Sequence, residues 1–448
     1  MKKRIAALVA LIAMLLSMPG CSFVDFDVDG RLRAPHAVGD QSAIQAALEQ
    51  HIFSTAEEAS GAYVLKYPKM GDYRSAFVMK DVTGDKNEEA IAFYALQPEG
   101  AKTHIALLSK VEGQWSCIDD VEGLATEIER IQFGDLDADG VVELFAGFSM
   151  YNTRDRRLMM YTWEDNHFVE RYSDTYTTMV VDKVISEKRD GLLLFRLNAK
   201  TSQTTVSLFT MENDTVKELG TSALDGYILQ FDRYQLATFE NGTVGLFQDC
   251  TKDVRSKITE LIYWDGEQLV TPLYDPAENI NFVSARESSL PSMDIDGDGM
   301  IDFPQSYRLP GYELVETEDM NLWMSEWYTW DIEKTEIKPV MTNIMVPDDG
   351  YYIELPEEWL GNVTAEYDAE KRHLVVKAVV DGVIGDKLFD VVAFETKDDN
   401  PFEDEDEYLF LESNNKVRYE LSYEKENEYE LSMDVLSELF NLCEIPGV

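Results

Sequence analysis

The sequence contains few cysteines, few basic residues and no long apolar segment beyond its first residues. Four cysteines in 448 residues are too few for a disulfide scaffold. Lys and Arg number 39 against 85 Asp and Glu, which gives a formal charge of −46. This balance excludes a nucleic-acid backbone or an anionic membrane surface as a partner. Apolar residues make up 45% of the chain, enough to build sizeable cores.

Patterns for common catalytic chemistry are also scarce. The five histidines occur in no HxH or HxxxH arrangement, and there is no phosphate-binding glycine loop. With 85 acids, carboxylate pairs for glycoside hydrolysis are unavoidable, and a sequence cannot measure the separation on which that chemistry depends. Tryptophans could stack on sugars, although at strand spacing we expect them mostly in the core. These are Trp163, Trp264, Trp323, Trp327 and Trp330.

Residues 1–20 are predicted to be an export signal. Three basic residues precede an apolar run that is too short for a transmembrane helix. Gly20 lies directly before Cys21, which resembles the lipobox of bacterial lipoproteins, where the cysteine is acylated and becomes the new N-terminus. The sequence therefore predicts lipidation at Cys21, with an ordinary cleaved signal as the alternative. The remaining cysteines are expected to be buried free thiols: Cys117, Cys250 and Cys443.

One pattern of oxygen-bearing side chains recurs three times. We call the copies loop 1 (residues 81–89), loop 2 (135–143) and loop 3 (294–302). Oxygen-bearing side chains occupy positions 1, 3, 5 and 9, and position 6 is Gly or Lys. Two further segments keep only the turn, Asp190-Gly191 and Asn241-Gly242. The five copies are spaced by 54, 51, 51 and 57 residues, a period typical of repeat architectures.

Short strands separated by Asp, Asn and Gly turns follow the same period. About four β segments per repeat predict the blades of a β-propeller, whereas helical repeats would need apolar residues at helical spacing. Helices are expected only outside the repeats, at residues 41–53 and Met433–Leu442. An apolar run of strand length follows each turn: Glu89–Tyr94, Glu143–Phe148, Leu192–Leu197, Val244–Asp249 and Asp302–Tyr307.

The DxDxDG loops at this period, one of them preceded by Phe133-Gly134, resemble the FG-GAP or VCBS repeats of integrin-α-type β-propellers. The resemblance covers about 270 residues and implies that the loops bind calcium and stabilise the blades, while ligands are bound elsewhere on the propeller. Five recognisable copies are fewer than the usual seven of that family.

The loops also suit calcium on chemical grounds. Ca²⁺ takes about six to eight oxygen ligands, and alternating carboxylates around a tight turn direct several of them into one concavity. An EF-hand is excluded because position 12 is Ala92, Ala146 or Gln305 instead of Glu. Two or three structural Ca²⁺ sites are expected, loop 1 being the weakest. The candidate ligands are Asp81, Thr83, Asp85 and Glu89; Asp135, Asp137, Asp139 and Glu143; and Asp294, Asp296, Asp298 and Asp302.

The sequence thus predicts a mainly β chain with a propeller of about five blades and a small C-terminal α+β domain, which faintly resembles Mog1/PsbP-like exported domains. We expect a monomeric, lipid-anchored protein at the bacterial cell surface that binds a surface protein or a glycan without catalysis. It would touch the membrane only through its lipid. A carbohydrate-active propeller enzyme with paired carboxylates is the alternative. The expected divisions are a signal peptide (1–20), a tether (21–40), a helix and lead-in strand (41–72), the propeller (73–345) and the α+β domain (346–448).

Overall fold

The computed structural model shows a mainly β chain. No helix within the described ranges is long and apolar enough to cross a membrane. The predicted signal peptide and Cys21 lie outside these ranges. The described residues are 38–55, 62–97, 101–150, 156–198, 200–313, 322–398, 400–402, 407–414, 416–425 and 429–445.

The strands form antiparallel sheets that we number from one to six in chain order. Sheets two to four are four-stranded meanders in which each strand pairs with the next along the chain. The first sheet contains β1 (Tyr63–Leu65), β2 (Phe77–Lys80), β3 (Glu89–Leu96), β4 (Thr103–Val111) and β5 (Gln114–Glu122). The second contains β6 (Glu127–Gly134), β7 (Glu143–Ser149), β8 (Arg156–Glu164) and β9 (His167–Tyr176). The third contains β10 (Thr178–Ser186), β11 (Arg189–Asn198), β12 (Gln203–Glu212) and β13 (Thr215–Leu224).

The later sheets are less regular. A long connection separates the fourth sheet from the fifth, and the last strand of the chain returns to pair with β21 in the fifth sheet. The fourth sheet contains β14 (Gln230–Thr238), β15 (Val244–Thr251), β16 (Lys257–Trp264) and β17 (Leu269–Val270). The fifth contains β18 (Phe303–Tyr307), β19 (Met324–Asp331), β20 (Glu336–Val346), β21 (Tyr351–Glu354) and β27 (Phe440–Leu442). The sixth contains β22 (Val363–Asp368), β23 (His373–Val380), β24 (Val383–Glu395), β25 (Leu409–Ser413) and β26 (Val417–Tyr423).

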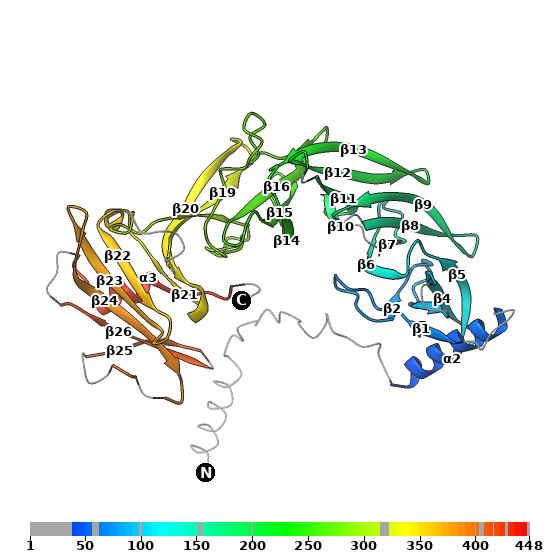
Figure 1. Cartoon of the computed structure of the whole chain (residues 1–448), viewed down its shortest axis with the longest axis horizontal. Coiled ribbons are helices and arrows are strands. Elements are labelled where there is room, and N and C mark those ends of the chain that lie inside the picture. The colour runs from blue at the N-terminus through cyan, green and yellow to red at the C-terminus, as the bar shows by residue number, and fades with distance from the viewer. Residues whose placement is uncertain are drawn as a thin grey trace, which may run out of the picture.

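Consecutive sheets stack face to face, and each pair encloses its own apolar core. The sheets follow one another along an arc, from the blue and cyan first sheet to the orange sixth sheet (Figure 1). Leu144 on β7 faces the first sheet, whereas its neighbour Phe145 packs against the third. Strands β3, β7 and β15 are therefore buried on both faces, which is why they read as continuous apolar runs rather than as alternating ones.

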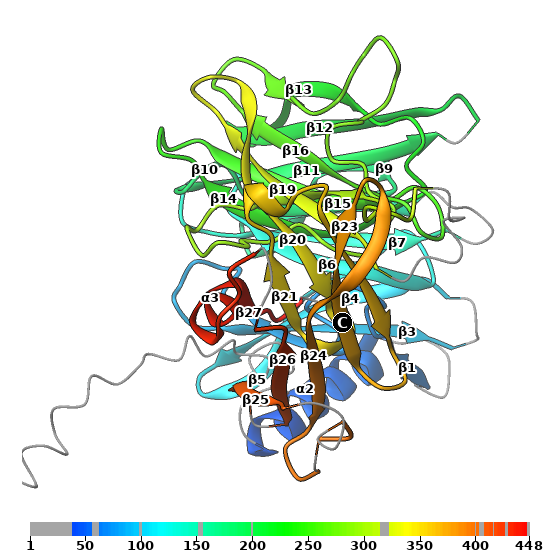
Figure 2. The same ribbon diagram turned by 90° about the vertical axis from the view of Figure 1, so that its left-hand side faces the viewer.

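Within the described residues, two α-helices lie outside the stack of the first five sheets. Helix α2 (Val38–Thr55) covers the outer face of the first sheet with a stripe that includes Ile44, Leu48 and Ile52. Helix α3 (Met433–Leu439) begins at Ser432, whose side chain accepts a hydrogen bond from the Val435 N–H. Figure 2 shows the same elements from the side of the sixth sheet, with α3 beside it.

The predicted strand after each turn is confirmed in all five copies, as β3, β7, β11, β15 and β18. The first helix is confirmed as well, but the expectation of helix through Met433–Leu442 is wrong at its end. Residues 440–442 leave the helix and form β27 because they pair with β21. The domain limits stay a prediction, and β21 and β27, which follow residue 345, belong to the fifth sheet.

Candidate metal centres

The three acidic loops occupy equivalent places in their sheets. Loop 1 joins β2 to β3, and loop 2 joins β6 to β7. In both, the residue before the loop pairs with the acid at position 9, as Lys80 does with Glu89 and Gly134 with Glu143. Loop 3 keeps this register in a single bridge between Met293 and Asp302. Each loop therefore connects two neighbouring antiparallel segments, and in loop 3 the first of these segments is a single bridge instead of a strand.

The acids at the two ends of each loop make the same backbone contacts. In loop 2 the carboxylate of Asp135 accepts a hydrogen bond from the Gly140 N–H at 2.9 Å, and Glu143 accepts one from the Leu136 N–H at 2.8 Å. In loop 3 the corresponding contacts join Asp294 to Gly299 at 3.0 Å and Asp302 to Ile295 at 3.2 Å. Loop 1 repeats both contacts. These repeated hydrogen bonds hold the first and last acids of each loop in place without a bound ligand.

Backbone conformation explains the composition of the loops. Position 6 has a positive φ in every copy, 71° at Lys86, 93° at Gly140 and 89° at Gly299. Glycine adopts this region at little cost, so that Lys86 makes loop 1 the most strained copy at this position. Position 4 is also left-handed, and there Ala138 of loop 2, with φ 62°, is the exception to glycine. The positive φ at position 4 was not predicted from the sequence.

Burial separates the acid at position 9 from the other acids. Glu89, Glu143 and Asp302 are buried, whereas Asp139 and Asp298 are exposed. Burial raises the pKa of Glu143 to about 8 and that of Asp302 to about 7, and the neighbouring loop carboxylates push both pKa values in the same direction. The pKa of Glu89 is raised for the same reasons. A cation in these loops would relieve this crowding of negative charge.

Loops 2 and 3 each bring three carboxylates together within 4.8 Å. In loop 1, which the structure describes completely, the acids form no such group; there Thr83 Oγ1 donates a hydrogen bond to Glu89 Oε1 at 3.2 Å. Asp298 accepts a hydrogen bond from the Met300 N–H at 2.7 Å and lies outside the group of loop 3, as Glu143 does in loop 2. The assignment of metal to these residues stays a prediction. The two groups are Asp135, Asp137 and Asp139, and Asp294, Asp296 and Asp302.

One eroded copy has a supporting role that the sequence did not suggest. Asp190, in the turn of the third sheet, accepts a hydrogen bond from the Asp135 N–H at 2.7 Å. Arg189 donates to the Leu136 carbonyl at 2.9 Å. The turn that has lost its own acidic ligands therefore anchors the start of loop 2. The only sequence signal for it is that Asp190 is in phase with the repeat.

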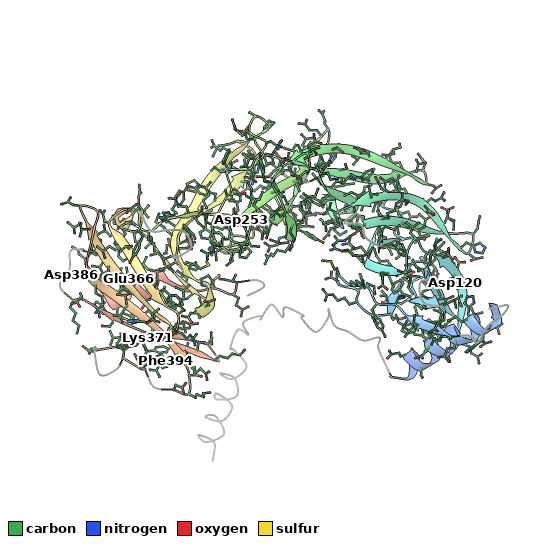
Figure 3. The ribbon with its side chains drawn as sticks, in the orientation of Figure 1. Asp120, Asp253, Glu366, Lys371, Asp386 and Phe394 are labelled. Carbon is green, nitrogen blue, oxygen red and sulfur yellow. The ribbon has the colours of Figure 1, made fainter. Side chains whose placement is uncertain are left out.

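The described histidines each contact an aspartate. Asp120 accepts contacts from both His51 Nε2 at 2.8 Å and His104 Nδ1 at 3.1 Å, and thereby links α2 to the first sheet (Figure 3). Two further pairs are His167 with Asp119 and His373 with Asp390.

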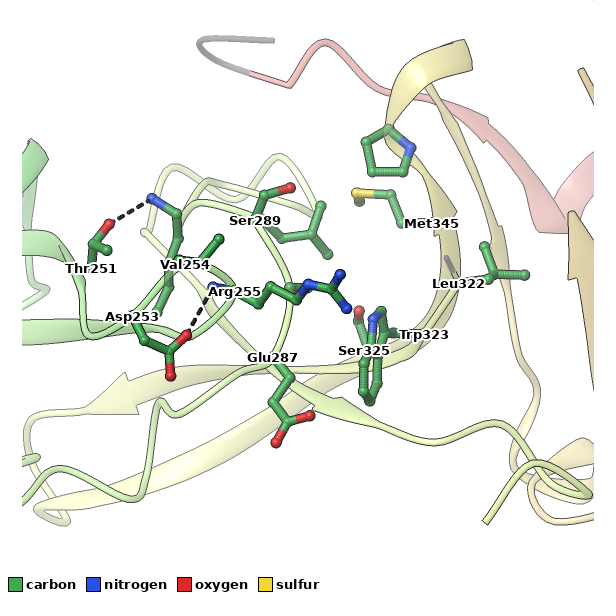
Figure 4. Close-up of a pocket in the computed structure, with 14 residues that line it drawn as sticks. Thr251, Asp253, Val254, Arg255, Glu287, Ser289, Leu322, Trp323, Ser325 and Met345 are labelled. Atoms are coloured by element: carbon green, nitrogen blue, oxygen red, sulfur yellow. Dashed lines mark hydrogen bonds between the residues drawn. The ribbon is translucent and has the colours of Figure 1, made fainter. Parts of the chain in front are cut away.

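The three cysteines are free thiols as predicted, but only Cys250 is buried as expected, whereas Cys117 and Cys443 are half-buried. Of the five tryptophans expected mostly in the core, Trp163 and Trp264 are half-buried against the cores between sheets. Trp327 and Trp330 are buried in the core as expected, whereas Trp323 lines a cavity between the fourth and fifth sheets (Figure 4).

No family model and no curated protein matches the chain. Among solved structures, it is similar to an exo-β-1,3-galactanase from Phanerochaete chrysosporium with galactose, at 9% identity and a TM-score of 0.26, covering 75% of this chain and 81% of that one. It is also similar to the rhamnogalacturonan lyase PL11 of Bacillus licheniformis, at 10% identity and a TM-score of 0.29, covering 72% of this chain and 77% of that one. The propeller of Dos1 matches at 8% identity and a TM-score of 0.26, covering 76% of this chain and 80% of that one. Likeness at this level carries no argument about function.

Proposed function

We propose that this chain is a lipid-anchored binding protein of the bacterial cell surface, with a β-propeller stabilised by calcium. The observation that carries the proposal is that three loops separated by more than 50 residues make the same backbone contacts and bury the acid at position 9. Solvated Asp-Gly turns need neither a common register nor a buried acid at position 9. A shared ligand accounts for both.

The donor set fits calcium. Ca²⁺ prefers oxygen ligands in a flexible shell, and loops 2 and 3 offer carboxylates together with backbone carbonyls. The buried carboxyl groups of Glu143 and Asp302, whose pKa values are raised, would be held ionised by a divalent cation. When bound, the ion would neutralise like charges and brace the connection between two strands. It would supply stability, not catalysis.

Calcium-dependent melting tests the proposal. Extracellular calcium modules have dissociation constants of about 10⁻⁴–10⁻³ M, so that each occupied site should add about 1–3 kcal/mol to the free energy of unfolding. We expect the melting temperature to rise with calcium and to fall with chelator. The response should shrink in Asp139→Ala and Asp298→Ala and persist in the control Asp214→Ala, which alters a hairpin turn. A melting curve that calcium and chelator leave unchanged would contradict the proposal.

The lipid anchor has a separate test. Mass spectrometry of the wild type, produced in a bacterial host that processes lipoproteins, should find an acylated cysteine at position 21, and the protein should fractionate with membranes. Cys21→Ser should remove the lipid and release the protein from the membrane fraction. Because the first 37 residues are outside the described ranges, this part of the proposal depends on the sequence motif alone.

A carbohydrate-active enzyme remains the second candidate and makes a distinct prediction. Its paired carboxylates would have to meet the substrate. Asp225 and Glu260 adjoin each other, and the pKa of Glu260 is raised to about 7, mainly by burial. Both side chains are completely buried, so this pair is closed to a glycan. Turnover on a glycan panel, abolished by a single Asp or Glu substitution at an exposed site, would replace the binding role with an enzymatic one.

A further inference from the structure

An open cavity of about 780 Å³ lies beside loop 3, and we call it the acidic cavity. Its walls come from β14, from loop 3, from the neighbouring strands β20 and β21, and from the segment that runs from β27 to Glu444. It shares no lining residue with the cavity at Trp323. Its volume is within the range of small-molecule sites.

The pairing of β21 with β27 sets which side chains border the acidic cavity. Tyr352 pairs with Asn441, and the Cys443 N–H donates to the Gly350 carbonyl at 2.9 Å, so the pairing extends one step beyond β27. Side chains alternate between the two faces of a strand, so Tyr352 and Glu354 lie on the same face as Asn441 and Cys443. All four of these side chains line the acidic cavity.

The acidic cavity is lined by carboxylates without a base to balance them. These belong to Asp294 and Asp296 of loop 3, to Glu354 at the end of β21 and to Glu444. None of the four forms a salt bridge within the described residues, and no lysine or arginine of that part of the chain lines the acidic cavity. The charge therefore disfavours an anion in this place and favours a cation.

Tyr352 indicates independently that a ligand with hydrogen-bond donors fits here. It is only 6% exposed, and its ring belongs to an apolar cluster with Met293, Ile295 and Trp327. Its hydroxyl has no hydrogen-bond partner within the described residues, although Tyr352 lines the acidic cavity. Burial, together with nearby acidic groups, raises the pKa of Tyr352 to about 12, so the hydroxyl stays neutral. An N–H group of a ligand would satisfy its oxygen, which is costly to leave without a partner.

The positions of the acids suit a ligand with more than one ammonium group. Glu354 lies at one end of the paired β21–β27 segment and Glu444 follows its other end, with Tyr352 between them. At about 3.3 Å per residue, the backbone positions of the two glutamates are more than about 10 Å apart. An aliphatic chain with an ammonium group at each end matches this separation better than a single ammonium group does. Leu442 and Met341 supply apolar surface for its methylene groups.

We propose that the acidic cavity binds an aliphatic polyamine. Its ammonium groups pair with Glu354, with Glu444 and with the carboxylates of loop 3, and one N–H donates to the Tyr352 hydroxyl. The inference rests on the proposed function, because it names a ligand class for a binding protein. It does not require calcium, since Glu354 and Glu444 lie outside loop 3.

Calorimetric titration of the protein with spermidine, n-butylamine and D-glucose separates the parts of this recognition. About 0.15 M NaCl screens the general attraction of a polyamine to a chain of charge −46. Spermidine should bind saturably at one site per chain. n-Butylamine has a single ammonium group and glucose has none, so each should bind at least about tenfold more weakly. Absence of saturable spermidine binding, or equal affinity for n-butylamine or glucose, would overturn the proposal.

Matched variants locate the site. Glu354→Gln should weaken spermidine binding by about tenfold or more, whereas Glu240→Gln, which removes the same charge from an exposed turn, should leave it unchanged. Tyr352→Phe keeps the ring in its apolar cluster and removes only the acceptor, so it should weaken binding by about threefold or more. Tyr227→Phe, at an exposed tyrosine, is its control. Equal effects within either pair of variants would contradict the site.

The response to calcium keeps the two proposals apart. Glu354 is not a candidate calcium ligand, so Glu354→Gln should retain the wild-type melting response to calcium. A normal calcium response in a wild type that does not bind spermidine would overturn the polyamine proposal alone. Spermidine binding without any calcium response would support the acidic cavity and overturn the calcium sites. Calcium should weaken spermidine binding by neutralising Asp294 and Asp296, and complete loss of binding at saturating calcium would place spermidine in loop 3 and contradict a separate site.

Discussion

Glu260 is a carboxylic acid enclosed in the fourth sheet. Its side chain is completely buried and accepts hydrogen bonds from the Asp225 N–H at 2.8 Å and from Asn281 Nδ2 at 3.2 Å. Burial raises its pKa to about 7, the negative charge of Asp225 adds to the effect, and Lys252 opposes it. The folded state therefore binds this proton more tightly than the unfolded chain does.

This difference predicts a pH dependence with a definite sign. A carboxyl group whose folded pKa is raised contributes stability that is fully present below its unfolded pKa, about 4.5, and is lost as the pH rises through about 7. The free energy of unfolding should therefore fall between about pH 5 and pH 8, by up to about 3 kcal/mol from this group. Denaturant unfolding across this pH range, at saturating calcium, measures the fall in the free energy of unfolding.

Glu260→Gln should flatten that slope because the amide does not titrate. The slope, not the absolute stability, is the readout, since the amide also changes the hydrogen bonds to Asp225 and Asn281. Glu240→Gln, at an exposed turn of the same sheet, should retain the wild-type slope. Parallel slopes in the wild type and in Glu260→Gln would contradict the raised pKa.

At the scale of elements, the connection between β17 and β18 depends on one buried ion pair. Arg286 in this connection is fully buried and donates to Asp249 of β15 at 2.8 Å, to Thr259 Oγ1 at 3.0 Å and to the Ser284 carbonyl at 3.0 Å. Asp249 also accepts hydrogen bonds from the Ser292 N–H, two residues before loop 3. The pair fixes a segment that has little regular structure of its own.

Arg286→Met should destabilise the protein by about 3–5 kcal/mol, because it leaves the carboxylate of Asp249 buried with inadequate compensation. The double variant Arg286→Met with Asp249→Asn should recover part of this loss, since the uncompensated charge is gone. Arg157→Met is the exposed control. Chemical denaturation checks all three, and a single-variant cost below about 0.5 kcal/mol would contradict a structural role for the pair.

Helix α2 provides a second element-scale prediction. Leu48 is completely buried between the helix and the first sheet, whereas Gln50 is exposed. Leu48→Ala should cost about 2–5 kcal/mol through lost burial and the cavity it leaves, and Gln50→Ala should change stability by less than about 0.5 kcal/mol. If the two variants unfold alike in denaturant, α2 does not belong to the cooperative unit.

Some of these elements could be predicted from the sequence and others could not, for physical reasons. The strand after each turn was predictable because its burial on two faces leaves a continuous apolar run beside a turn signal. The acids of loops 1 to 3 were predictable because they are local in sequence. The pairing of β21 with β27 joins residues about 90 positions apart in strands of three or four residues, too short to carry a period. The cavity between the fourth and fifth sheets was not predicted because four separate segments of the chain build it.

At the scale of the whole molecule, the dominant property is a formal charge of −46 on a stack of sheets. The three acidic loops contain only 12 of the 85 acids, so most of the negative charge is independent of the candidate metal sites. Such an excess destabilises the compact state through self-repulsion, and salt screens it over about 10 Å at 0.1 M. Cations should therefore stabilise the protein in two ways, by general screening of its negative charge and by specific binding in the acidic loops.

The effects of salt and of calcium on the melting temperature should be additive. Different variants should alter each of the two effects. In chelator, the melting temperature should rise as NaCl increases from about 10 to 300 mM, because the Debye length falls from roughly 30 Å to below 10 Å. Calcium added at the high salt concentration should raise the melting temperature further, because calcium binds specific ligands in a loop and does not act only by screening. Asp139→Ala should keep the NaCl response and lose part of the calcium response. Loss of the wild-type calcium response at high salt would mean that calcium acts by screening alone.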